Sequence, residues 1–84
     1  MGKLHVVSDN PNTRMGLALA GVSNQPAHTP EELKQALEGI APDIGIVIIT
    51  SSLAAKGAEI LEKYRQKNHL PLVVVIPDYT ATLI

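Results

Sequence analysis

The sequence predicts a small α/β domain, in which an open, four-stranded parallel sheet has the strand order 2-1-3-4 and carries three helices on its two faces. Three observations predict this fold class. Residues 44–50 and 72–76 are apolar without alternation, which is typical of parallel strands covered on both sides. Segments with helical spacing of apolar residues lie between the predicted strands. Right-handed crossovers then distribute the helices over both faces.

The first strand and the first helix are expected at the start of the chain. Residues 3–8 form a short strand, and the polar residues after it break it, because Asp9 and Asn10 favour turns and helix caps. Pro11 suits the first turn of a helix, where its missing N–H would have no partner anyway. Gly21 is a stop signal. The helix has one apolar face, formed by Met15, Ala18, Leu19 and Val22.

The second helix has the clearest boundary signals. Thr29 caps it, Pro30 takes its first position, and Glu32 completes a capping box with Thr29. Its buried stripe consists of Leu33, Ala36, Leu37 and Ile40, and it ends at Gly39 and Pro42. Residues 22–28 before it are interpreted as a short edge strand, because Pro26 cannot donate to a sheet ladder. A plain loop is the alternative.

A third helix is expected between the two apolar strands. Ser51 or Ser52 caps it. One face of it carries Leu53, Gly57, Ile60, Leu61 and Tyr64. Cations gather near its end at Lys63, Arg65, Lys67 and His69, where they meet the negative end of the helix macrodipole. We interpret them as a solvated helix end, and a patch for an acidic partner is the alternative.

Composition limits the classes of function. The 84 residues predict one domain, with a core over about residues 1–77 and a tail over 78–84. There is no Cys, which excludes disulfides and thiolate chemistry. The net charge of −1 gives no electrostatic reason to expect a nucleic-acid partner. The apolar runs are shorter than the ~20 residues that span a bilayer, and the start lacks a signal-peptide core, so no membrane insertion is expected.

Ligands of open parallel sheets bind at the carboxyl ends of the strands. There the sequence has Ser8, Asp9, Asn10, Thr50, Ser51, Pro77 and Asp78. Receiver domains share this flavodoxin-like fold class, but Thr50 stands where a receiver has its phosphorylated Asp. No Lys follows the last strand, which leads to Pro77. A receiver-like regulatory domain that acts by protein contact, without a phospho-acceptor, is therefore the alternative function.

No catalytic, cofactor or metal site is predicted elsewhere. The chain has no Gly-x-Gly-x-x-Gly motif and no Walker motif. His5, His28 and His69 are widely separated and have no spaced Cys or carboxylate companions. Ser51 and Ser52 lack a nucleophile-elbow pattern. A small phosphoryl-transfer enzyme would need a nucleophile or a metal site that the sequence lacks, so we expect a protein that works by docking onto other proteins.

Four ordered pieces resemble the F subunit of the V-type and A-type rotary ATPases and ATP synthases. Val6-Val7-Ser8-Asp9 precedes Gly16-Leu17-Ala18-Leu19-Ala20-Gly21-Val22, which is similar to the family's Gly-Phe-Arg-Leu-Ala-Gly-Val. Thr29-Pro30-Glu31-Glu32 opens the second helix. The apolar strand 44–50 follows, and Leu70-Pro71 leads through 72–76 into Pro77. The resemblance covers essentially the whole chain.

Two departures from the family pattern matter. Ala18 stands where the family usually has Arg, and Leu17 where it often has Phe, so an intersubunit contact made by that Arg would be altered. Family members also continue past Ile-Pro into a C-terminal helix, whereas this chain stops at Ile84. We therefore expect it to correspond to the N-terminal domain, as a truncated or divergent member.

The resemblance implies a non-catalytic rotor part, cytoplasmic and peripheral to the membrane. The family's F subunit binds the coiled-coil D subunit in the central stalk, which turns inside the catalytic A/B hexamer and connects to the membrane rotor. It thereby couples ATP turnover to proton or other ion transport. Its interface is expected at the apolar tail residues Tyr79, Leu83 and Ile84, with a frayed terminus as the alternative.

Overall fold

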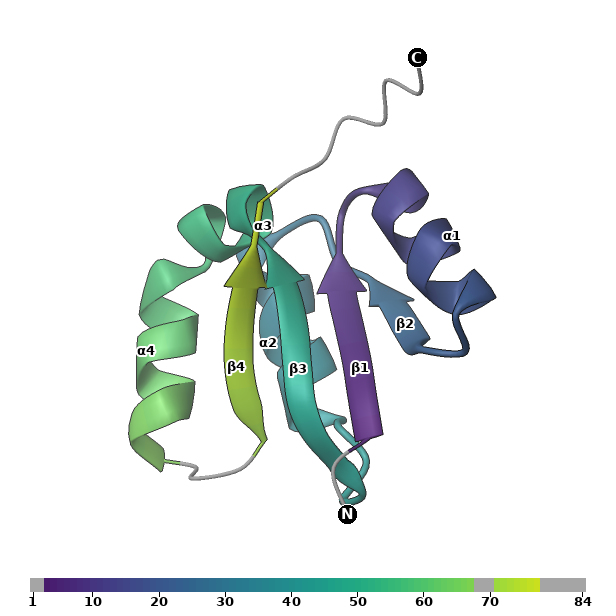
Figure 1. The fold of residues 1–84 in the computed structure, drawn as a ribbon. Coiled ribbons are helices and arrows are strands. Elements are labelled where there is room, and N and C mark those ends of the chain that lie inside the picture. The colour runs from purple at the N-terminus through teal and green to yellow at the C-terminus, as the bar shows by residue number, and fades with distance from the viewer. Residues whose placement is uncertain (1–2, 68–70, 78–84) are drawn as a thin grey trace.

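The computed structural model describes residues 3–67 and 71–77. Eight elements follow one another along them (Figure 1). They are β1 (Lys3–Ser8), α1 (Pro11–Leu19), β2 (Ser23–Pro26), α2 (Pro30–Glu38), β3 (Ile44–Thr50), α3 (Ser51–Lys56), α4 (Ala58–Lys67) and β4 (Leu72–Ile76). The strand expected within residues 22–28 is thus confirmed as β2.

The four strands form one parallel sheet in the order β2-β1-β3-β4. Val6 of β1 lies opposite Ile48 of β3, and Ile48 lies opposite Val74 of β4. The fold class and the strand order predicted from the sequence are confirmed. The chain passes from β1 to β2 on one side of β1. It then returns across the sheet to β3 and β4, which lie on the other side of β1.

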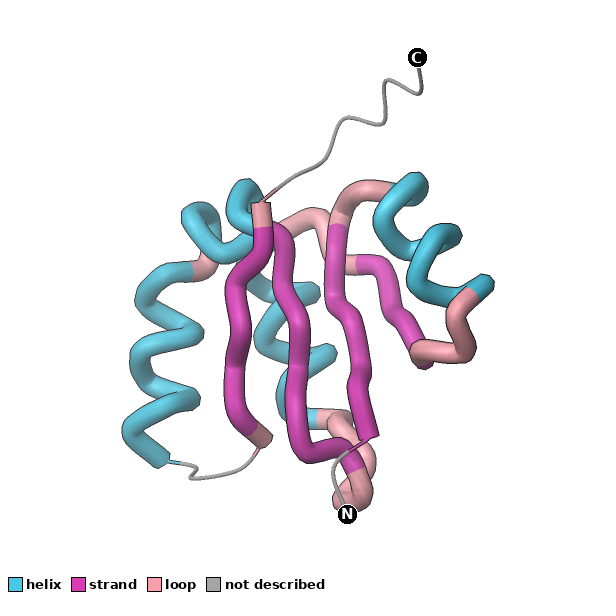
Figure 2. Tube along the Cα trace, viewed as in Figure 1, coloured by secondary structure: helices cyan, strands magenta, loops and turns pink. Residues whose placement is uncertain are grey.

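The helices are shared unequally between the two faces of the sheet (Figures 1 and 2). α1 lies over β1 and β2 on one face, while α2, α3 and α4 lie on the other. Right-handed crossovers require this, because the chain reverses its direction across the sheet after β2. The described residues contain four helices, not three, since the expected third helix breaks at Gly57.

The hydrophobic core fills the space between the sheet and the helices α2, α3 and α4. Its buried members are Val7, Ala27, Leu33, Ala36, Leu37, Val47, Ile49, Leu53 and Leu61. The predicted stripe of α2 supplies three of them. Val47 and Ile49 point into this core from β3, so the residues that alternate with them point to the opposite face.

The capping box that opens α2 is confirmed in part, because Glu32 accepts from the residue before the N-cap instead of from Thr29 itself. The Oγ1 of Thr29 accepts from the backbone N–H of Glu32 at 3.1 Å. The carboxylate of Glu32 reaches back to the N–H of His28 at 2.7 Å. Gly39 caps the other end of the helix. These bonds satisfy backbone groups that would otherwise have no intrahelical partner.

The caps of the other helices follow the predictions less closely. Asn10 caps α1, and its Oδ1 accepts from the N–H of Asn12 at 2.9 Å. The prediction of a serine cap after β3 is wrong: Thr50 is the N-cap residue and makes no side-chain cap bond. Gly21, in the turn after α1, has the left-handed φ of 85° that favours glycine.

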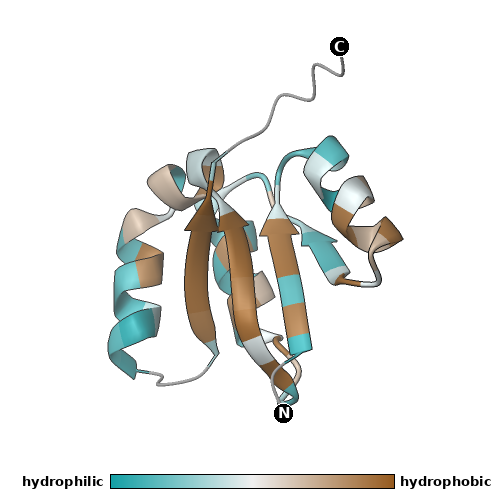
Figure 3. Cartoon of the chain, viewed as in Figure 1, coloured by the Kyte–Doolittle hydropathy of each residue, from teal (hydrophilic) through white to brown (hydrophobic). Residues whose placement is uncertain are grey.

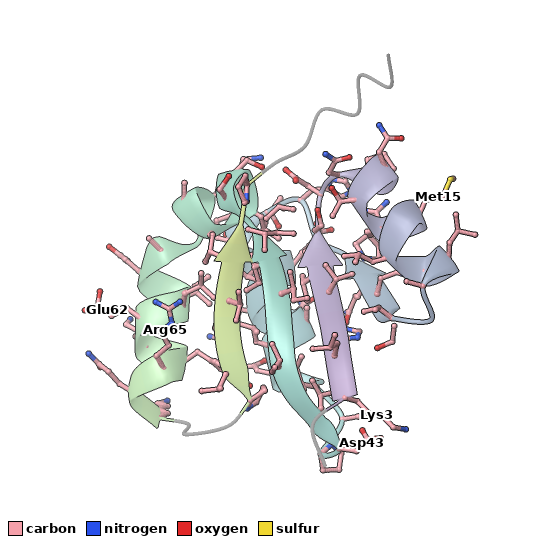
Figure 4. The ribbon with its side chains drawn as sticks, viewed as in Figure 1. Lys3, Met15, Asp43, Glu62 and Arg65 are labelled. Atoms are coloured by element: carbon pink, nitrogen blue, oxygen red, sulfur yellow. The ribbon has the colours of Figure 1, made fainter. Side chains whose placement is uncertain are left out.

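The apolar face predicted for α1 is wrong, because it does not face the sheet. Met15 is 64% and Leu19 is 86% exposed, and Met15 points away from the sheet (Figure 4). The half-buried side of α1 carries Arg14, whose Nη1 donates to the Ser8 carbonyl at 2.7 Å.

The expectation that β4 is covered on both sides is also wrong, since Leu72 and Val74 are exposed. Three crossovers connect the four described strands, and the two that follow β2 place their helices on the other face of the sheet. β4 is an outer strand of the described sheet, and one of its carbonyls is bonded to a side chain. The Nη2 of Arg65, on α4, donates to the carbonyl of Val73 at 3.4 Å. His69, predicted as part of the basic helix end, lies outside the described residues.

We predict opposite effects for two Gly-to-Ala changes. A Cβ at Gly57 would overlap the side chain of Leu33, which is fully buried. Gly57→Ala should therefore lower the free energy of unfolding by about 1 kcal/mol or more. A Cβ at Gly16 would meet nothing within 4 Å. Gly16→Ala should raise the free energy of unfolding by about 0.5–1 kcal/mol, because it favours the helix.

Urea denaturation followed by circular dichroism measures both free energies. Equal shifts for the two variants would contradict the close packing of the α3–α4 junction on Leu33.

Candidate functional site: the strand ends and an uncovered sheet face

The carboxyl ends of β1 and β3 are joined by a buried pair of hydroxyl groups. The Oγ of Ser8 and the Oγ1 of Thr50 are 3.0 Å apart, and both residues are fully buried. The Oγ of Ser8 also accepts from the N–H of Asn10 at 2.9 Å. This pairing explains why Thr50 does not cap α3 with its side chain. It ties the two central strands to each other and to the start of α1.

Asp9, the acidic group at the strand ends, is engaged by two side chains of α3. The Oγ of Ser52 donates to its Oδ1 at 3.3 Å, and the Nζ of Lys56 lies 3.5 Å from its Oδ2. The side chain of Asp9 is 18% exposed. A carboxylate that is largely enclosed and already paired serves to position α3 against the end of β1.

The other residues considered in the sequence as sites are not brought together. His5 lies within β1, and its Nδ1 is 2.7 Å from the Oγ of Ser23 in β2. His28 precedes α2. In the described ranges, no three His, Cys, Asp or Glu side chains gather closely enough to hold a metal ion. Nor is any helix in those ranges both long enough and apolar enough to cross a bilayer.

The most distinctive surface is apolar and lies on the sheet itself. We call it the uncovered face. It consists of Leu4, Ile48, Leu72, Val74 and Ile76. Leu4, Leu72 and Val74 are 40%, 56% and 43% exposed. Figure 3 shows β3 and β4 as largely apolar ribbons with no helix in front of them. A parallel sheet normally has both faces covered, so a surface of this kind favours a binding partner.

Sequence reasoning missed the uncovered face, although the sequence contained the signal. The order 2-1-3-4 with right-handed connections places the first helix on this side and the later ones on the other. On β1, where α1 lies over the sheet, Val6 is fully buried. Farther from α1, no helix of the described chain covers β3 and β4 on this side. The predicted interface residues Tyr79, Leu83 and Ile84 lie outside the described residues, as does Asp78 at the end of the last strand.

Three comparisons with known proteins agree with one another. The family model of the ATP synthase (F/14-kDa) subunit matches residues 4–83. The F subunit of the A-type ATP synthase of Methanosphaera stadtmanae is 31% identical over 71 residues, in an alignment that covers 82% of this chain and 67% of that protein. The crystal structure of the F subunit of the V-type ATP synthase from Archaeoglobus fulgidus superposes with a TM-score of 0.69 at 28% identity. The match covers 89% of this chain and 96% of that one.

We predict different effects for two Thr-to-Val changes, one at the end of β3 and one on α1. Thr50→Val removes one member of the buried hydroxyl pair and should lower the free energy of unfolding by about 1 kcal/mol. The Oγ1 of Thr13 is also buried but has no hydrogen-bond partner within the described part of the chain. Thr13→Val should therefore leave the free energy of unfolding unchanged or raise it.

Chemical denaturation of the two variants and the parent chain measures this difference. A loss of similar size in both would show that the Ser8–Thr50 pair contributes nothing specific.

Proposed function

The chain belongs to the ATP synthase F/14-kDa subunit family, and from this premise we propose that it is a non-catalytic rotor subunit of a V/A-type rotary ATPase or ATP synthase. In this proposal it docks on the coiled-coil D subunit of the central stalk. It thereby helps to couple ATP turnover in the catalytic A/B hexamer to ion transport in the membrane sector. Its place is cytoplasmic and peripheral to the membrane.

The observation that carries the proposal is the uncovered face. Its side chains are aliphatic, and they are contributed by three adjacent strands. Apolar surface gains roughly 25 cal/mol per Å² when it is removed from water. A helix with an apolar stripe could cover the uncovered face and exclude water from it, as the chain's own helices do on the opposite face of the sheet. One helix of a coiled coil offers such a stripe on a rigid support.

The strand ends support a non-catalytic role. Ser8 and Thr50 use their hydroxyl groups on each other, and Asp9 is held by Ser52 and Lys56. Catalytic groups must reach a substrate, whereas these groups are occupied in joining α1 and α3 to the sheet. We therefore place ATP chemistry in other subunits of the assembly.

The apolar tail extends the proposed interface. β4 ends at Ile76, which belongs to the uncovered face, and the chain continues to Tyr79, Leu83 and Ile84. These three side chains follow the uncovered face so closely in sequence that a partner seated on β4 would lie within their reach. We propose that they contact the same partner.

Two substitutions on β4 test which face binds. Val74 and Val75 are neighbours with exposures of 43% and 42%, but they point to opposite faces of the sheet. The parent chain should co-elute with a D-type coiled coil after co-expression. Val74→Lys places a charge in the proposed interface and should weaken binding by about 2 kcal/mol, roughly thirtyfold in Kd. Val75→Lys, the matched control, should leave the Kd within about twofold.

Isothermal titration calorimetry measures the two Kd values, and thermal unfolding of each free variant checks the fold. Equal weakening by both changes would argue against docking through the uncovered face. Failure of the parent chain to co-elute at several salt concentrations would count against the stalk assignment as a whole.

Deletion of residues 79–84 tests the tail separately. The deletion should weaken binding to the coiled coil while the unfolding midpoint of the free chain stays the same, because the core that the structure describes is built from earlier residues. The same calorimetric titration measures the change. An unchanged affinity would remove Tyr79, Leu83 and Ile84 from the interface.

A further inference from the structure

A second surface lies at the opposite end of the sheet from Asp9. A cavity of about 1000 Å³ opens between α2 and α4, beside the amino ends of β3 and β4. Its apolar floor is formed by Leu37, Ile40, Ile44, Ile60 and Tyr64. Partial burial raises the pKa of the Tyr64 hydroxyl, so this side chain remains neutral at ordinary pH. The floor is therefore uncharged and largely hydrophobic.

Three lysines stand on the rim of this cavity. Lys34 comes from α2, and Lys63 and Lys67 come from α4. All three are exposed. The ion pairs within the described ranges are Lys3–Asp43 and Lys56–Asp9, so none of the three rim ammonium groups is paired there. We call the floor and these lysines together the basic groove.

Few carboxylates balance this charge. Asp43 also lines the cavity, but its Oδ2 is 3.0 Å from the Nζ of Lys3 (Figure 4). The hydrogen bond and the positive charge of Lys3 hold the pKa of Asp43 below its usual range. Glu38 is the remaining acidic residue of the described lining. The groove is thus positive on a chain whose net charge is −1.

Helix stability accounts for the three lysines only in part: Lys34 precedes Glu38 by four residues on α2, but the two form no ion pair in the described structure. Lys63 and Lys67 are four residues apart on one face of α4, where like charges repel. Glu59 precedes Lys63 by four residues but forms no ion pair with it in the described structure. The macrodipole favours cations in the last turn of α4, but not Lys34 in the interior of α2. The lysines share the groove, which the two helices build together.

We propose that the basic groove is a docking site for an acidic amphipathic helix of a partner protein. Apolar side chains of that helix lie on the floor, and its carboxylates meet the ammonium groups of Lys34, Lys63 and Lys67. Charge complementarity selects the occupant: cations around an apolar floor match an apolar stripe bordered by glutamates. A small anion fits less well, because all three cations are exposed and the sites of small ligands enclose most of the ligand surface.

This surface is separate from the one in the proposed function. The basic groove lies on the side of the sheet that α2 and α4 cover, whereas the uncovered face lies on the other. A substitution can therefore abolish binding to a D-type coiled coil without affecting binding in the groove, and the reverse also holds.

A synthetic peptide serves as the probe. It is a helix of about 16 residues with leucine on one face and glutamate on the other. A control peptide of the same length has lysine at every glutamate position. Fluorescence anisotropy measures the binding of each labelled peptide to the full chain. Amide chemical shifts show where it binds.

We expect the glutamate peptide to bind, to shift the amides of α2 and α4, and to lose affinity several-fold between about 0.05 M and 0.5 M salt. Lysine-to-glutamine substitution at all three rim positions should weaken the binding of the glutamate peptide by about tenfold or more. Lys63→Gln should weaken binding more than Arg65→Gln. Arg65 is the matched control, a cation on the same helix that does not line the groove.

The proposal would be overturned by equal binding of the two peptides, by unchanged binding to the triple variant, or by amide shifts confined to the uncovered face. Inorganic phosphate or ATP that shifts the groove amides when the glutamate peptide does not would also overturn it, in favour of a small-anion site. The comparison of peptides needs no variant, so it holds even if the triple variant folds poorly.

Discussion

The handedness of the strand connections is the constraint on which the rest of this structure depends. β2 lies to one side of β1, and β3 and β4 lie to the other. Right-handed crossovers then send α1 to one face and the three other described helices to the opposite face. One face of the sheet is therefore packed by three described helices, and the other face is packed by α1 alone. The core and the basic groove belong to the first side, and the uncovered face belongs to the second.

Much of the fold could be predicted from the sequence because its signals are local. Apolar runs predicted β3 and β4, and the capping box predicted the start of α2. The orientation of α1 could not be predicted in this way. Periodicity shows which side chains share a face, but here the bond from Arg14 to the Ser8 carbonyl accompanies an outward-facing Met15 and Leu19. Likewise, the packing at the Gly57 break depends on a Leu33 side chain that is distant in sequence.

The candidate surfaces were less predictable because they combine residues from separate elements. Lys63 and Lys67 were visible as a basic helix end, yet Lys34 joins them only through the packing of α2 beside α4. Ser8 and Thr50 could be identified from the sequence as strand-end residues. Only the structure shows that their hydroxyl groups bond to each other and so join the two central strands. The tail residues of the expected interface lie outside the described ranges, so their role stays a prediction.

The contact between Arg65 and the Val73 carbonyl bears on how the free chain avoids association with copies of itself. A protein with a bare aliphatic face is prone to self-association, and an unpaired strand edge offers the most direct route, by adding strands from further copies. The guanidinium occupies an acceptor on that edge of β4, and Pro26 removes a donor from the other outer strand. Addition of strands from other copies is thereby discouraged at both edges of the described sheet, while the uncovered face stays available for assembly.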